Sequence, residues 1–198
     1  MDDYVTFEAV LKGQGLTRNL SINFNNLHLV RPCMEYMASF KEALFEYMAH
    51  RVEEFSYPKL TTEKDVKAYL RRVADYEKGK VPEHHVPSSA FWLVDGQQYL
   101  GSGDVRHHLN DQLRRLGGNI GYAIRPAGWG RGLGTTNLAL LLNEAKKLGI
   151  QRPVITCFDE NIASYKVIEK NGGILKGKVE NRVMGYKRLT RLYEIDIM

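Results

Sequence analysis

Apolar residues recur along this chain in two patterns, short continuous runs typical of strands and wider spacings typical of helices. The runs predict strands at Leu27–Arg31, Ala90–Val94, Gln98–Val105, Asn119–Ile124 and Pro153–Phe158, and two closing strands near Gly173–Glu180 and Val183–Ile197. The helical spacings predict helices at Cys33–Phe55, Thr61–Lys78, Gly132–Leu148 and Ile162–Lys170, with an irregular or helical crossover at Arg106–Leu116. Strands with interposed helices indicate an α/β fold with a mixed sheet.

Turn and capping residues agree with these elements and indicate one domain. Asp95-Gly96 between two strand runs predicts a hairpin turn, and Thr61-Thr62-Glu63 is typical of a helix start. The segment Lys80–Ser89 contains two prolines and is expected to be a loop. Residues 1–26 show no clear periodicity, so we expect an N-terminal extension of uncertain structure ahead of a single domain at residues 27–198.

The segment Ile120–Thr135 combines a strand, a glycine-rich turn and a helix start. Glycines at alternate positions let a ligand approach the main chain closely. The helix start adds unpaired N–H groups and the positive end of the helix dipole. The segment therefore predicts a site for an anion such as pyrophosphate. Its candidate ligands are Trp129, Gly130, Arg131, Gly132, Leu133, Gly134 and Thr135.

Several kinds of glycine loop are compatible with such a turn. A Walker loop requires G-x-x-x-x-G-K-[ST], which does not occur in this sequence. A dinucleotide loop requires G-x-G-x-x-G and an acidic residue about 20 residues later, whereas the spacing here is G-x-G-x-G. A third kind has the pattern [QR]-x-x-G-x-[GA], which Trp129–Gly134 matches except at Trp129. An ordinary strand-to-helix turn is the alternative without a ligand.

A second motif follows the predicted strand that ends at Phe158. The residues Asn161–Gly172 match the pattern N-x-x-S-x-x-x-x-E-K-x-G. The two motifs, in this order, resemble the GCN5-related N-acetyltransferase (GNAT) superfamily, whose acetyl-CoA loop is the third pattern above. Further segments resemble a branch of uncharacterised bacterial predicted acetyltransferases, and the likeness spans roughly Leu27 to Ile197.

The resemblance implies a fold, a donor and a mechanism. The fold is the GNAT-type acyl-CoA N-acyltransferase fold, a central, mostly antiparallel sheet flanked by helices, with a splayed cofactor strand. The donor is acetyl-CoA, and an amine attacks its thioester directly. Main-chain groups of Tyr122 and Ile124 would pair with the pantetheine arm, and an N–H at or beside Ile124 would face the thioester oxygen. Asn161 and Ser164 would contact the same arm, although Asn161 equally suits a helix N-cap.

The sequence departs from better-known members at two catalytic positions. The base glutamate of some members corresponds to Gly118, and the tyrosine that protonates the leaving thiolate corresponds to Ile168. The remaining candidates for acid or base work are His107 and His108, because imidazole titrates near neutral pH. The alternative is that these histidines belong to a packed loop.

Two polar residues beside these histidines are candidates for acceptor binding. Arg106 and Asn110 are expected to orient the acceptor, for example one with a carboxylate. We therefore expect an N-acetyltransferase that acts on an amine, small molecule or peptide, of unknown identity. A non-catalytic acyl-CoA-binding module is the alternative that the missing glutamate and tyrosine motivate.

Composition limits the other function classes. The formal net charge is +5, which makes a nucleic-acid-binding basic domain a further alternative, but the basic residues are spread along the chain. No apolar run approaches a membrane span, the start has no signal-peptide character, and Cys33 and Cys157 lie far apart. We expect a reduced, cytoplasmic setting, no metal site, and a homodimer as one assembly, since dimers are common among relatives.

Overall fold

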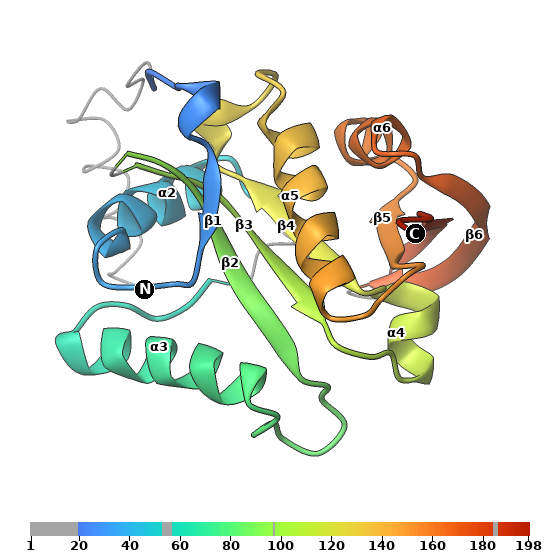
Figure 1. The fold of residues 1–198 in the computed structure, drawn as a ribbon, viewed down its shortest axis with the longest axis horizontal. Helices are drawn as coiled ribbons and strands as arrows, with labels where there is room; N and C mark the ends of the chain where they lie inside the picture. Colours follow the sequence, from blue (N-terminus) through green and yellow to red (C-terminus); the bar gives the residue numbers. More distant parts are fainter. Residues whose placement is uncertain (1–19, 53–56, 97, 184–185) are drawn as a thin grey trace.

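The computed structural model describes residues 20–52, 57–96, 98–183 and 186–198, and it contains two antiparallel sheets (Figure 1). The first sheet has the strand order β1-β2-β3-β4, and the second has the order β5-β7-β6. The strands are β1 (His28–Val30), β2 (Ser88–Asp95), β3 (Gln98–Arg106), β4 (Ile120–Ile124), β5 (Val154–Phe158), β6 (Ile174–Val183) and β7 (Tyr186–Glu194). Seven strand runs were expected from the sequence, and each coincides with one of these strands.

Helices cover both faces of the first sheet. They are η1 (Phe24–Asn26), α2 (Met37–Ala49), α3 (Glu63–Glu77), α4 (Asp111–Leu116), η2 (Pro126–Gly128), α5 (Leu133–Lys147) and α6 (Ile162–Lys170). Alternate residues of a strand face opposite sides of a sheet. Phe91 of β2 accordingly packs with Leu138 and Leu141 of α5, whereas its neighbour Trp92 packs with Phe40 of α2. The layers are α5, the sheet, and then α2 with α3.

The strands β4 and β5 are neighbours that do not form a ladder. A single isolated bridge between Gly118 and Ile155 joins them, where the Asn119 N–H donates to the Val154 carbonyl at 2.6 Å. Beyond this bridge the two strands belong to different sheets. The splayed arrangement that we expected at the cofactor strand is therefore present.

Several predicted boundaries are wrong. The helix predicted at Cys33–Phe55 is shorter, because α2 begins at Met37 and ends before His50, and Arg51 has a positive φ of 51°. Residues 53–56 lie outside the described residues. The predicted loop ends early, since Ser88 and Ser89 already pair with β3. In the first case the apolar pattern continues past the helix end, and in the second two polar serines, which the pattern does not mark as strand residues, pair with β3.

The last residues of the predicted extension pack against the domain. Leu20 is buried in a cluster with Leu93, Leu100 and Leu133, and its carbonyl accepts a hydrogen bond from Nη1 of Arg131 at 2.6 Å. Residues 1–19 lie outside the described residues. The boundary at residue 26 therefore does not mark the first residue that contributes to the core.

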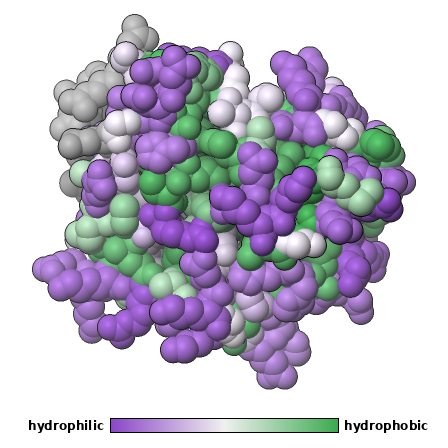
Figure 2. Space-filling model, in the orientation of Figure 1, coloured by the Kyte–Doolittle hydropathy of each residue, from purple (hydrophilic) through white to green (hydrophobic). Residues whose placement is uncertain are grey.

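The surface shows hydrophilic residues over most of the face in Figure 2, with separate apolar areas between them. None of the helices in the described part of the chain combines the length and the apolar character that crossing a membrane requires.

Candidate active site

A cavity of about 1620 Å³ runs along β4. Its walls come from the loop before α5 and the start of α6 on one side, and from α2, α3 and α4 on the other. Tyr122 and its neighbours Gly121 and Ala123 all line it. Because adjacent residues of a strand point to opposite faces, the cavity gives access to β4 from both layers.

The start of α5 forms one end of this cavity. Gly132 is the N-cap of the helix, with φ +83°, and Gly130 has φ +73°. A Cβ at either glycine would meet no atom within 4 Å, so the space in front of them is open. Backbone N–H groups and the positive end of the helix dipole therefore face an open space without side chains between them. This geometry suits a diphosphate.

The outer edge of β4 faces the gap toward β5. The Arg125 N–H donates to the Leu100 carbonyl of β3 at 2.9 Å. In an antiparallel ladder the next residues back along the strand alternate in direction, so the peptide groups of Ile124 and Tyr122 point away from β3. The indole Nε1–H of Trp129 donates to the Ile124 carbonyl at 2.7 Å. The Ile124 carbonyl, which was predicted to pair with pantetheine, thus already accepts a hydrogen bond from the Trp129 side chain.

Binding of acetyl-CoA is expected to change the fluorescence of Trp129. A pantetheine arm that pairs with Ile124 must exchange for the indole N–H, so the environment of this half-exposed ring changes. The other tryptophan, Trp92, is buried at 1 % exposure and serves as the internal reference. A titration of emission with acetyl-CoA should show saturation, and Trp129→Phe should remove the change. An equal change in the Trp129→Phe variant would contradict the exchange.

The start of α6 lies across the gap from β4. Asn161 is the N-cap of this helix, and its side-chain oxygen accepts the Ser164 N–H at 3.0 Å. The Ser164 hydroxyl in turn lies 3.0 Å from the Tyr122 hydroxyl. Burial raises the pKa of Tyr122, so the phenol keeps its proton at neutral pH. The N-cap role of Asn161 is confirmed, and all three residues line the cavity.

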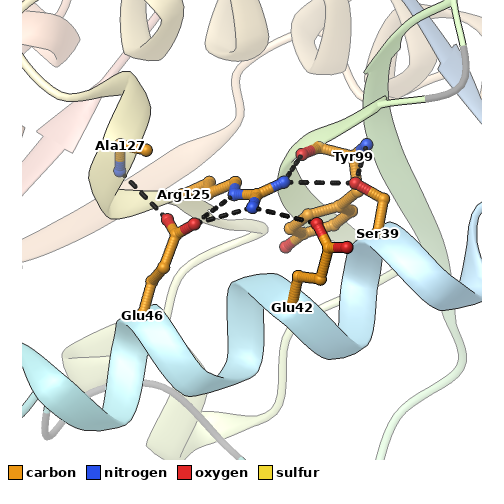
Figure 3. A network of polar contacts seen from close by, with 6 residues as sticks. All are labelled: Ser39, Glu42, Glu46, Tyr99, Arg125 and Ala127. Atoms are coloured by element: carbon orange, nitrogen blue, oxygen red, sulfur yellow. Dashed lines mark hydrogen bonds and ion pairs between the residues drawn. The ribbon is translucent and has the colours of Figure 1, made fainter. Parts of the chain in front are cut away.

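A buried ion pair holds α2 against the turn that leads into the glycine loop (Figure 3). The Arg125 guanidinium lies 2.6 Å from Oε1 of Glu46, and the two side chains are 3 % and 8 % exposed. Oε2 of Glu46 accepts the Ala127 N–H of η2 at 3.1 Å. Arg125 also donates to the Ser39 hydroxyl at 3.1 Å. The network therefore fixes the position of the segment between β4 and α5.

Comparison with known proteins agrees with this geometry. The family model described as Acetyltransferase (GNAT) domain matches residues 34–174. The chain belongs to the GNAT acetyltransferase family. This confirms the predicted family, fold class and enzyme class, an N-acetyltransferase that uses acetyl-CoA.

Solved structures of GNAT enzymes share the fold at low sequence identity. RimL, a ribosomal L7/L12 alpha-N-protein acetyltransferase in complex with coenzyme A, has a TM-score of 0.67 at 16% identity, covering 89% of this chain and 97% of its own. The microcin C7 self immunity acetyltransferase MccE, in complex with acetyl-CoA and AMP, has a TM-score of 0.67 at 16% identity, with coverages of 87% and 93%. The ribosomal-protein-S5-alanine acetyltransferase from Vibrio fischeri has a TM-score of 0.64 at 16% identity, with coverages of 89% and 96%. No curated protein matches the sequence significantly.

The two familiar catalytic positions of GNAT enzymes have structural roles in this member. Gly118 has φ +67°, and a Cβ there would lie 2.4 Å from the Val154 carbonyl oxygen, so a glutamate does not fit. Ile168 is fully buried in the core around α5. Neither position therefore supplies an acid or a base.

The two candidate histidines lie away from the cavity. Neither His107 nor His108 is among its lining residues in the described part of the chain. Nε2 of His107 is 2.9 Å from the Ser89 hydroxyl, which also donates to Glu77 at 3.2 Å. Burial lowers the pKa of His107, while the carboxylate of Glu77 opposes the shift. His107 therefore joins β2, α3 and the end of β3, as in the packed-loop alternative.

Replacing His107 by glutamine is expected to leave kcat/KM within about threefold of the parent enzyme, because this side chain does not line the cavity in which the reaction is expected. Loss of the bond to Ser89 should lower the free energy of unfolding by about 1 kcal/mol. Steady-state kinetics and urea unfolding measure the two effects. A loss of kcat by orders of magnitude with an altered pH–rate profile would instead restore His107 as the base.

The predicted acceptor residues do line the cavity, on its α4 side. Arg106 donates from Nη1 to the carbonyls of Gly117 and Gly118 at 3.0 and 2.9 Å. Asn110 caps α4 and donates from Nδ2 to the His84 carbonyl at 3.1 Å. Both side chains are thus held in place by the protein, and their contact with an acceptor stays a prediction.

Sequence reasoning missed Asp104, which lies on β3 beside the middle of β4. Its carboxylate pairs with Nη2 of Arg106 at 3.2 Å. The signal available in the sequence was an acidic residue two positions before Arg106 in a strand, which places both on one face. Within the described residues, no group of three or more His, Cys, Asp or Glu side chains could hold a metal ion.

Proposed function

We propose that the start of α5 holds the diphosphate of acetyl-CoA and that the gap between β4 and β5 holds its pantetheine arm. The observation that carries this proposal is the continuous cavity from the open glycines Gly130 and Gly132 to the outer edge of β4. The outward peptide groups of Tyr122 and Ile124 would then pair with the arm as an added strand would.

The acceptor amine approaches from the opposite layer, between α3, α4 and the sheet. The thioester lies at the end of the arm beside β4, and the cavity continues past β4 to Tyr69, Tyr76 and Leu113. The Ile124 N–H, which points into the gap, would donate to the thioester oxygen as negative charge develops there. Catalysis then rests largely on positioning of amine and thioester.

Calorimetric titration with acetyl-CoA, followed by a thiol-release assay against a panel of amines, tests the proposal. We expect one binding site per chain and release of coenzyme A with at least one amine. Binding without turnover on any amine would favour the non-catalytic alternative, an acyl-CoA-binding module. Absence of binding would refute the assignment of the glycine loop.

The setting and assembly of the protein are also proposals. We infer that the protein works in the cytoplasm, because both cysteines are free thiols, and burial raises the pKa of Cys157 to about 11. Dimers are common among relatives, so we propose a homodimer, which light scattering during gel filtration would test. A salt-dependent gel shift would detect the nucleic-acid binding that we do not expect.

A further inference from the structure

The floor of the acceptor side of the cavity consists of small residues around one carboxylate. Asp104 on β3 lies between Ala90 on β2 and Gly121 on β4, since these three residues are in register. A Cβ on Gly121 would lie 2.6 Å from Oδ1 of Asp104, so the carboxylate extends over this glycine. Gly121 directly precedes Tyr122, whose peptide group faces the proposed pantetheine arm. Asp104 thus lies on the acceptor side of the sheet, and its partner Gly121 is three residues along β4 from Ile124, whose N–H is proposed to face the thioester.

The charges around the cavity are strongly unequal. Among the described residues that line it, Asp104 is the only carboxylate. Five lining side chains carry a fixed positive charge, namely Arg51, Arg72, Arg106, Lys166 and Lys170. A cavity with this balance attracts anionic molecules and repels polycations. Of these five, Lys166 and Lys170 lie on α6, on the side proposed for coenzyme A and its phosphates. Arg72 and Arg106 lie on the acceptor side, where they favour an acceptor that carries an acidic group.

Asp104 and Arg106 form a pair of opposite charges at 3.2 Å. The position of the Arg106 guanidinium is fixed, because its Nη1 donates to the carbonyls of Gly117 and Gly118. The side chains of Asp104 and Arg106 are 35% and 24% exposed, so both remain accessible from the cavity. A molecule with an ammonium and a carboxylate close together presents the complementary pair of charges.

We infer that Asp104 and Arg106 bind an acceptor whose primary amine lies close to an acidic group, as in a free amino acid, with Asp104 taking the ammonium and Arg106 the acid. The inference rests on the proposed acetyl transfer and names its acceptor class. Arg72, on the α3 wall, adds attraction for the acidic group. Polyamines and other polycations are disfavoured.

The chemical step follows from this placement. Asp104 accepts one proton from the ammonium, and the freed lone pair attacks the thioester carbon. A C–N bond forms and the C–S bond breaks, and the amide nitrogen gives its extra proton to the leaving thiolate. The products are the N-acetylated amine and coenzyme A, and Asp104 returns its proton to solvent. Partial desolvation of this 35% exposed side chain raises the pKa of Asp104 against the opposing effect of Arg106, which favours proton acceptance.

Matched acceptor pairs test the acceptor class. We expect serine and aspartate to be acetylated with a kcat/KM at least about tenfold above that of serinamide and of putrescine, because the amide and the diamine lack the acidic group. A short peptide with a free N-terminus and a neutral C-terminus is also tested, to represent a protein acceptor. Faster turnover of serinamide, putrescine or the peptide would overturn the inference while leaving acetyl transfer intact. Absence of turnover with all acceptors, despite binding of acetyl-CoA, would overturn both the acceptor class and the proposed acetyl transfer.

Two variants test the residues. Arg72→Gln should raise KM for aspartate several-fold without changing affinity for acetyl-CoA, whereas Arg71→Gln, on the same helix and exposed outside the cavity lining, should not. Asp104→Asn should lower kcat by about 100-fold or more at neutral pH. Its activity should recover as rising pH deprotonates the amine in solution, which a merely structural role would not produce.

The pH measurement must consider the other titratable groups around Asp104. Those that line the same side of the cavity are Tyr69, Arg72, Tyr76, His84, His85 and Arg106. His84 and His85 are the two imidazoles among them, so a double variant with both replaced by glutamine is the control. If the alkaline recovery of Asp104→Asn disappeared in that background, the assignment of the proton to Asp104 would be wrong.

Discussion

Replacing Gly132 by valine is expected to lower the affinity for acetyl-CoA by at least about 100-fold. Gly132 has φ +83°, a backbone conformation that is strained for any residue with a Cβ and most of all for a branched one. The valine side chain would also enter the open space that the diphosphate is proposed to occupy. Both the strain and the lost space affect the backbone N–H groups at the start of α5 that are proposed to bind the diphosphate. Calorimetric titration with acetyl-CoA measures the loss.

Gly149 provides a matched control at the other end of the same helix. It has φ +78°, and a Cβ there would likewise meet no atom within 4 Å. Gly149→Val should therefore reduce the free energy of unfolding by a similar amount, while leaving acetyl-CoA affinity unchanged. Equal affinity losses in the two variants would show that the effect is general destabilisation, and unaltered affinity in Gly132→Val would remove the diphosphate from this loop.

Replacing Glu46 by alanine is expected to lower the free energy of unfolding by about 3–5 kcal/mol, because it leaves the Arg125 guanidinium buried without its principal partner. The Ala127 N–H loses its acceptor as well. Since Ala127 belongs to the turn before the glycine loop, affinity for acetyl-CoA should fall in the same variant. Chemical denaturation and ligand titration measure the two losses.

Glu42 is the control for this second prediction. It lies one helical turn before Glu46 and approaches the same guanidinium at 3.5 Å, but its side chain is 50% exposed. Glu42→Ala should cost below about 1 kcal/mol, as exposed ion pairs usually do. Similar losses at Glu42 and Glu46 would mean that burial does not decide the contribution of the pair.

The sequence predicted those features that depend on neighbouring residues. The runs that became β3 and β4, the hairpin at Asp95-Gly96, and the helix α3 with its N-cap Thr62 are all encoded locally. The capping box of Thr62 with Asp65 is an example, since both partners lie within one turn. The glycine turn that leads into α5 was predicted for the same reason, because its order in the chain is also its order in space, and its role in binding acetyl-CoA stays a prediction.

Features that depend on distant residues were missed. Arg125 and Glu46 are 79 positions apart, and their meeting requires the packing of α2 on the sheet. Asp104 was not singled out, because its place beside Gly121 of β4 follows from the strand register and not from the local sequence. His107 is a different case: it was singled out because it follows the strand next to the cofactor strand, and its ring lies 2.9 Å from the Ser89 hydroxyl, so a catalytic role for it stays a prediction.

The break between the two sheets has a consequence for handling the protein. The outer edge of β4 is a row of peptide groups with a ladder on one side only, and such edges promote aggregation by pairing with strands of other molecules. Trp129 shields one carbonyl of that row. The donor substrate would mask the remainder, so coenzyme A in storage buffers should act as a solubilising additive as well as a ligand.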